Sequence, residues 1–198
     1  TIIGVDLAKR VFQVHGASIA GEVKFRKKLT REQFRLFIAQ QPACIVVFEA
    51  CGSANYWSRE VEKLGHEPKL IAPQYVRPFV KRQKNDATDA EAIVIAARQP
   101  EMRFVLPKTA EQQAKSVLFR NRERLVRQRT ELVSALRSAL YEYGHVFPIG
   151  LAHLKRMDAL VQGPDCDLPS LIITECQELL AQIAETTELR MNLSTPLE

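Results

Sequence analysis

Apolar and polar positions form short runs along the first 72 residues, a pattern typical of β-strands. The run at 11–17 alternates, whereas the run at 44–48 is continuously apolar, as in a central strand buried on both faces. Turn residues separate the first runs, with Lys9 and Arg10 after one and Gly21 after the next. We expect strands at residues 2–5, 11–17, 22–29, 44–48 and 69–72.

Three helices are expected among and after these strands. Thr30 and Gln33 form a capping box that opens the first helix, a second follows residue 53, and a third covers residues 86–97. Three hairpin strands followed by helix, strand, helix and strand is the order of the ribonuclease H fold. We therefore expect an α/β fold in which a mixed five-stranded sheet is flanked by helices.

A long helix without interruption is expected next. Residues 109–143 contain neither Pro nor Gly, and apolar side chains recur every seven positions, which predicts a heptad seam. The seam is formed by Leu118, Leu125, Leu132 and Ala139. A second helix with the same periodicity is expected at about 170–191, joined to the first by a loop. The two helices are expected to form a long antiparallel hairpin or a dimerising coiled coil.

Prolines and charge divide the chain. Pro100 and Pro107 end the α/β domain, which we assign to residues 1–107, and the helical arm occupies 108–198. The net charge of +5 favours a polyanionic partner. The first helix of the arm is strongly basic, with eight Lys or Arg against three Glu between positions 108 and 137, and the end of the chain is acidic. The acidic helix is expected to pair with the basic one or to avoid the same nucleic acid.

Two classes of protein do not fit the composition. No run of eighteen apolar residues and no signal-peptide core occurs, so we expect a cytoplasmic protein with no membrane partner. The four cysteines form no C-x-x-C pair and complete no zinc spacing with the four histidines, so we expect free thiols.

Four acidic residues are candidates for a metal site. Asp6 ends the first buried strand and Glu49 ends the fourth, while Asp86 and Asp89 lie three residues apart at the start of a helix. Oxygen ligands of this kind suit Mg²⁺ or Mn²⁺, and pairs of such ions cleave phosphodiesters. Each acid taken alone also has a structural explanation, because strands often end in polar turns and acids cap helix N-termini.

Three segments resemble those of a known family. They are GVDLAK at 4–9 with FQV at 12–14, FEACG at 48–52, and KNDATDA at 84–90. Together, and in this order, they resemble the DEDD transposases of the insertion sequence 110 family, which are related to the pilin-gene-inverting recombinases. The resemblance covers essentially the whole chain.

The resemblance implies a fold like that of the Holliday-junction resolvase RuvC, with Mg²⁺ or Mn²⁺ held by the DEDD set Asp6, Glu49, Asp86 and Asp89. It also implies a DNA substrate, a coiled-coil arm, homodimers or tetramers, guidance by an element-encoded bridge RNA, and a place at the bacterial nucleoid. Family members continue into a C-terminal transposase domain that supplies a serine nucleophile, which is absent from this chain. We therefore expect the chain alone not to complete recombination. Ser53 is better explained as a helix N-cap than as a substitute nucleophile.

Basic residues next to the acids and on the long helix are candidates for nucleic-acid contacts. The first group precedes Asp86, and the second shares one face of the long helix because its members are four and three residues apart. We expect phosphate contacts from Arg77, Lys81, Arg82, Lys84, Arg120, Arg124 and Arg127. Tyr75 and Phe79 interleave with the first group, where core packing explains them better than base stacking.

Three rival functions follow from the same residues. A stand-alone junction-resolving nuclease would use the acids for hydrolysis without a serine partner. A non-catalytic module for RNA binding and oligomerisation would use them only as helix caps. A phosphotransferase of the sugar-kinase type would need a glycine-rich phosphate loop after the first strand, and residues 6–9 contain no glycine.

Overall fold

The computed structural model describes residues 1–80 and 86–194, without the side chains of residues 86–88 and 194. The chain divides into two compact units, Thr1–Gln113 and Ala114–Glu198, which are described separately below. No helix within the described ranges is long and apolar enough to cross a membrane.

A mixed sheet of six strands forms the first unit. Its order is β3-β2-β1-β4-β5-β6, in which β1, β4 and β5 are parallel and the other pairings are antiparallel. The strands are β1 (Ile2–Leu7), β2 (Val11–Ala17), β3 (Val23–Thr30), β4 (Ile45–Glu49), β5 (Glu67–Ile71) and β6 (Phe104–Val105). This confirms the expected mixed sheet flanked by helices. The short β6, which pairs with β5, adds a strand beside the two prolines where the sequence indicated only the domain edge.

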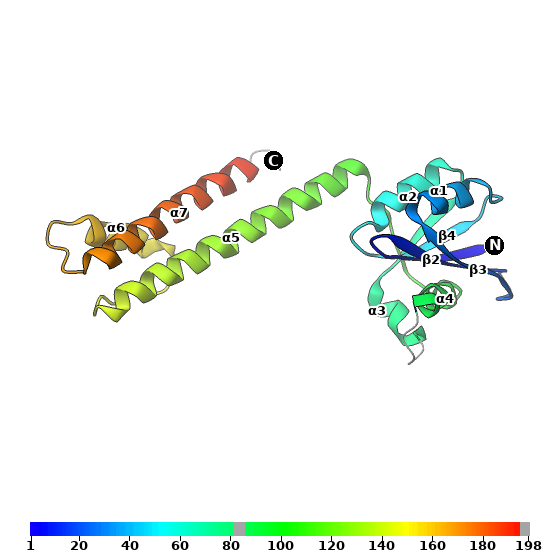
Figure 1. Ribbon diagram of the computed structural model, residues 1–198, viewed down its shortest axis with the longest axis horizontal. Helices are drawn as coiled ribbons and strands as arrows, with labels where there is room; N and C mark the ends of the chain where they lie inside the picture. Colours follow the sequence, from blue (N-terminus) through cyan, green and yellow to red (C-terminus); the bar gives the residue numbers. More distant parts are fainter. Residues whose placement is uncertain (81–85, 195–198) are drawn as a thin grey trace. The chain divides into compact units, whose positions relative to one another are not determined.

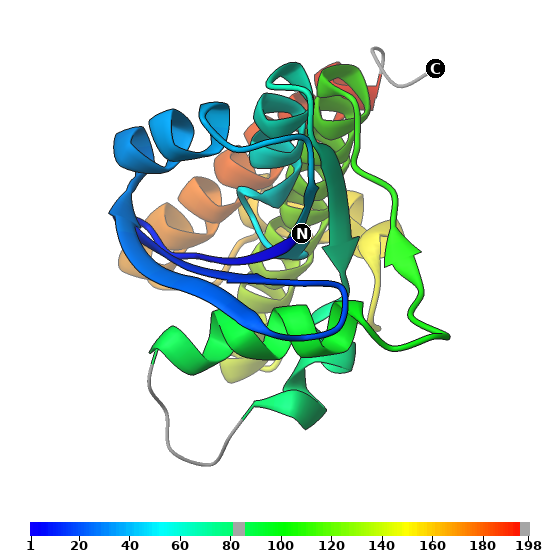
Figure 2. The same cartoon turned by 90° about the vertical axis from the view of Figure 1, so that its right-hand side faces the viewer.

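Helices cover both faces of the sheet (Figures 1 and 2). Helices α1 and α2 lie on one face, and α4 with the short α3 lies on the other. Their bounds are α1 (Arg31–Ala39), α2 (Ala54–Lys63), α3 (Pro73–Val76) and α4 (Asp86–Ala97), with a 3₁₀ turn η1 (Arg77–Phe79) after α3. The expected capping box is confirmed, because Thr30 accepts from the amide of Gln33 and the Gln33 side chain accepts from the amide of Thr30.

Alternation along the strands assigns the side chains to two cores. On the α1/α2 face, Phe12, Phe34 and Trp57 meet edge to face with ring centroids 5.1–5.4 Å apart. The guanidinium of Arg31 lies 5.3 Å from the centre of the Trp57 ring. On the opposite face, Val47 and other strand residues pack against the apolar side of α4. The sheet is therefore covered on both sides, as its continuously apolar central strand predicts.

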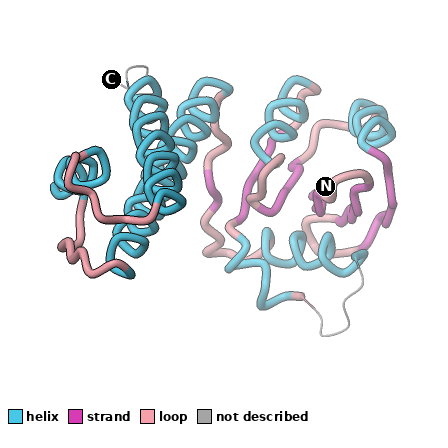
Figure 3. The backbone as a smooth tube through the Cα atoms, turned by 60° about the vertical axis from the view of Figure 1, so that its left-hand side comes forward, coloured by secondary structure: helices cyan, strands magenta, loops and turns pink. Residues whose placement is uncertain are grey.

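An antiparallel pair of long helices forms the second unit (Figure 3). Helix α5 (Ala110–Glu142) begins in the first unit, and α7 (Ser170–Ser194) returns beside its later turns. A buried seam of Val133, Leu136, Leu140 and Ile183 joins them. The expected helical hairpin is confirmed. The connection is more than a loop, since it contains the 3₁₀ turn η2 (Leu151–His153) and the helix α6 (Leu154–Gln162), whose Met157 is fully buried in the seam.

Candidate metal centre at the ends of β1 and β4

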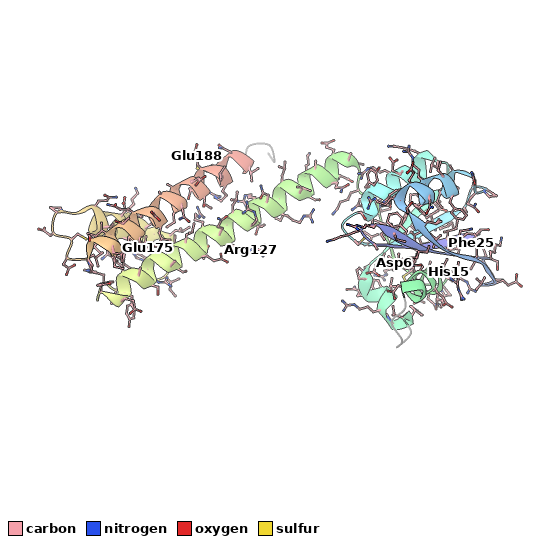
Figure 4. All side chains as sticks on the ribbon, viewed as in Figure 1. Asp6, His15, Phe25, Arg127, Glu175 and Glu188 are labelled. Carbon is pink, nitrogen blue, oxygen red and sulfur yellow. The ribbon has the colours of Figure 1, made fainter. Side chains whose placement is uncertain are left out.

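The two strand-end acids lie at the same level of the sheet. Strands β1 and β4 are parallel neighbours with Val5 opposite Phe48, so Asp6 and Glu49 each follow one step later. Val5 and Phe48 are fully buried on the α1/α2 face. Because successive side chains point to opposite faces of a strand, Asp6 and Glu49 face α4. Both are partly buried (Asp6 is labelled in Figure 4).

A close approach of α4 to β1 places the third acid nearby. Gly4 shares a face with Asp6, and a Cβ added to Gly4 would lie 2.6 Å from both the carbonyl oxygen of Ala90 and Cγ2 of Val94. The backbone of α4 therefore rests directly on β1. Asp89 immediately precedes Ala90, so the same contact holds the first turns of α4 against the carboxylate end of the strand.

The electrostatics of Glu49 show which charged groups share its surroundings. Burial raises the pKa of the Glu49 carboxyl, the negative charge of Asp89 raises it further, and the guanidinium of Arg77 partly opposes this. Two carboxylates that repel each other in a partly desolvated place are a suitable donor set for a hard divalent cation, because bound metal reverses the local effect on the pKa.

The fourth acid is only partly described. Asp86 is the first residue of α4, but its side chain lies outside the described residues. Among the side chains that are described, no three from His, Cys, Asp and Glu are close enough together to share a metal ion. The four cysteines are free thiols, as expected.

The basic residues before α4 have different positions. Arg77 is exposed in η1 and its charge reaches Glu49. Lys81, Arg82 and Lys84 lie outside the described residues. Of the two interleaved aromatic residues, Phe79 packs against the core beneath α4 and Tyr75 is 43% exposed.

The three arginines of the long helix are all exposed (Figure 4 labels Arg127). Arg124 bonds within its own helix, donating to Asn121 and to Gln128 at 3.1 Å. Arg124 and Arg127 line an open surface depression of about 360 Å³ together with Gln128 and Glu131. Arg120 donates to the carbonyl oxygen of Ser116 at 3.3 Å.

Ser53 occupies the N-cap position of α2, as expected, but its side chain makes no capping hydrogen bond. The expected position is confirmed, and the expected capping bond is absent. Its φ of −105° and ψ of −3° differ from the extended backbone that usually lets an N-cap hydroxyl reach back to the helix.

One polar cluster on the α4 face was missed in the sequence. His15 is 3% exposed, and Arg26 donates from Nε to His15 Nδ1 at 3.4 Å. Arg26 also pairs with Glu91 of α4 at 3.6 Å, which ties the edge strand β3 to the helix. The available signal was the run of basic residues in β3, in which Lys24, Arg26 and Lys28 occupy every second position.

Comparisons with known proteins identify the relatives of this chain. Residues 3–145 match the transposase family of the DEDD, insertion sequence 110 type. A probable family 20 transposase of Pseudomonas aeruginosa is 55% identical over 142 residues, which are 72% of this chain and 42% of that protein. A putative transposase of Sinorhizobium fredii is 44% identical over 197 residues, covering 96% of this chain and 51% of the relative.

A third relative is the transposase for insertion sequence element IS1328 of Yersinia enterocolitica. It is 42% identical over 173 residues, which are 87% of this chain and 51% of the relative. The chain thus spans about half the length of these curated relatives. With the matched segment covering the whole ribonuclease-H-like sheet and its acids, the chain belongs to the DEDD transposases of the insertion sequence 110 family.

Proposed function

We propose that this chain carries the metal-binding carboxylates with which a transposase cleaves and rejoins DNA strands. Asp6, Glu49, Asp86 and Asp89 are the proposed ligands of Mg²⁺ or Mn²⁺. The main support is the register of β1 and β4, because it aligns Asp6 with Glu49 on the face covered by the helix that bears Asp89.

The chemistry of the donor set fits this role. Divalent ions bound there would activate an attacking oxygen and stabilise the leaving oxygen of a phosphodiester. The protein's own contribution would be to position the carboxylates, with Asp6 and Glu49 on sheet strands and Asp86 and Asp89 on a helix packed against Gly4. Arg77, whose positive charge already reaches Glu49, would bind a backbone phosphate next to the acids.

The rest of the recombination machinery is proposed to lie elsewhere. Residues 1–107 would form the carboxylate domain and 108–198 the helical arm, while the serine nucleophile would come from a part of the transposase not included in this chain. We further propose that Arg120, Arg124 and Arg127 bind the phosphates of a guide RNA and that the arm supports homodimers or tetramers. Their exposure on one helix supports the contact with RNA.

Calorimetric titration with Mn²⁺ tests the shared site. We expect Asp6→Ala and Asp89→Asn each to abolish binding while circular dichroism stays unchanged. Glu32→Gln is the matched control, because Glu32 is an exposed acid in the first turn of α1, away from the proposed ligands. Unchanged titrations of both ligand variants would refute the shared site. Metal-dependent hydrolysis of branched DNA by this chain alone would favour the junction-resolving nuclease instead.

A further inference from the structure

A row of polar side chains crosses the sheet from the carboxylates to its free edge. Asp6 of β1 pairs with Gln13 of β2, and Gln13 pairs with Lys28 of β3. The intervening residues Val14 and Phe12 belong to the core on the α1/α2 face. Asp6, Gln13 and Lys28 therefore all point to the α4 face at the same level of the sheet.

The far end of this row is open to solvent. Strand β3 is the last strand on its side of the sheet, and α4 packs mainly over β1, β2 and β4, reaching β3 through the ion pair of Glu91 with Arg26. Lys28 is exposed, and Gln13 is partly buried between it and Asp6.

Lys28 differs from Lys24 and Arg26, the cations at the preceding alternate positions of β3. Lys24 donates to Thr1 Oγ1 at 2.9 Å, and Arg26 is engaged by His15 and Glu91. Within the described part of the chain, Lys28 makes no ion pair. Its charge is available to a partner that arrives along the row.

We propose that the DNA strand held at the carboxylates continues over Gln13 and is bound through a backbone phosphate by Lys28. This inference rests on the proposed function, since the carboxylates define where the strand starts. Adjacent strands of a sheet are about 4.8 Å apart, so Lys28 and Asp6 are separated by roughly 10 Å at the backbone. The phosphate at Lys28 would therefore lie within a few nucleotides of the one at the carboxylates.

Charge complementarity supports DNA as the occupant of this strip. Asp6 and Glu49 repel an approaching polyanion unless cations neutralise them, and a lysine placed two strands away attracts the same backbone without competing for the metal. Gln13 offers an amide that donates to phosphate or sugar oxygens between the two.

The neighbouring residue on β3 supplies a matched control. Lys27 has the same charge and is also exposed, but it points to the opposite face, where its Nζ lies 5.4 Å from the centre of the Phe37 ring. The experiment compares Lys28→Ala with Lys27→Ala in the 198-residue chain. Affinity for a 30-base-pair DNA duplex of random sequence is measured from low to high salt, with an RNA duplex of the same sequence in parallel.

We expect Lys28→Ala to weaken DNA binding roughly threefold to tenfold at low salt and to reduce the salt slope by about 0.9, the release of one counterion. Lys27→Ala should leave both unchanged. Equal losses in the two variants, no loss in Lys28→Ala, or a loss confined to RNA would each overturn the proposal. A Mn²⁺ titration of Lys28→Ala separates the two hypotheses: normal metal binding with lost DNA affinity supports the DNA strip, and failure of the wild type to bind Mn²⁺ refutes only the metal site.

Discussion

Ionisation of the Glu49 carboxyl is unfavourable in the folded chain when no metal is bound. Burial and Asp89 raise the pKa of Glu49, so the folded chain takes up a proton there more readily than the unfolded chain does. Stability from this group is therefore greatest below the ordinary glutamate pKa and falls as the pH rises through the raised value.

Glu49→Gln should remove the unfavourable free energy of ionising this side chain in the folded protein. In metal-free buffer we expect the variant to have a higher Tm than the wild type at pH 7, and the difference to shrink by pH 4. Thermal unfolding at both pH values is the measurement. A Tm difference that grows on acidification would mean that the folded protein stabilises the ionised carboxylate.

Proton and metal should also compete at this carboxylate. Because the raised pKa keeps Glu49 protonated to a higher pH, Mn²⁺ affinity should decline on acidification before an ordinary glutamate would protonate. Isotherms collected between pH 5 and pH 8 check this. An affinity that is constant over that range would exclude Glu49 from the ligand set.

Gly4 controls the fit between α4 and the sheet. Gly4→Ala would force the added Cβ against the backbone carbonyl of Ala90, and backbone cannot move aside as the end of a flexible side chain can. We expect a loss of about 1–3 kcal/mol in the free energy of unfolding and weaker Mn²⁺ binding, because Asp89 moves with the helix. Denaturant unfolding and calorimetry measure the two effects. Gly52→Ala is the control, since no atom beyond its chain neighbours lies within 4 Å of its added Cβ, and similar losses there would contradict a role for the close contact.

At the scale of elements, the seam of the helical hairpin holds the second unit together. Leu136 on α5 is fully buried, so Leu136→Ala should cost about 2–5 kcal/mol and leave a cavity. Leu171 on α7 is 77% exposed, and Leu171→Ala should change stability little. Far-UV circular dichroism during urea unfolding compares the two. Equal effects would mean that the seam does not stabilise this unit.

Elements with strong local signals were predictable from the sequence, and elements that depend on distant partners were not. Alternation and the Thr30 capping box located β2 and α1. By contrast, β6 has two residues and exists because it pairs with β5 across more than thirty positions of sequence. The sequence predicts only a loop where helix α6 lies, because α6 is short and its apolar face becomes buried only when α5 and α7 pack against Met157.

The candidate site was likewise predictable from the sequence only in part. The strand-end acids Asp6 and Glu49 followed from apolar runs that stop at a carboxylate, and the parallel register supplies their alignment. The role of Gly4 as a contact surface for α4 needed the packing of a strand on a helix that is remote in sequence. The same holds for the link of His15, Arg26 and Glu91, which joins two strands and a helix.

At the scale of the whole molecule, part of the positive charge lies on one exposed surface, that of helix α5. If the exposed arginines of α5 bind RNA, replacing Arg120, Arg124 and Arg127 together by Gln should lower the salt slope of RNA binding by roughly 2 to 3. Filter binding at several salt concentrations measures it. Lys155→Gln, on the exposed side of α6, is the control for loss of charge alone, and an unaltered slope in the triple variant would move the RNA interface to another surface.

The chain has a single tryptophan, Trp57, and it is 4% exposed among the aromatic rings of the first unit. Its fluorescence therefore reports on the first unit, and we expect the emission to change when that unit unfolds. The ellipticity at 222 nm draws heavily on the long helices α5 and α7. Recording both signals in one melt would separate the unfolding of the two units without any label.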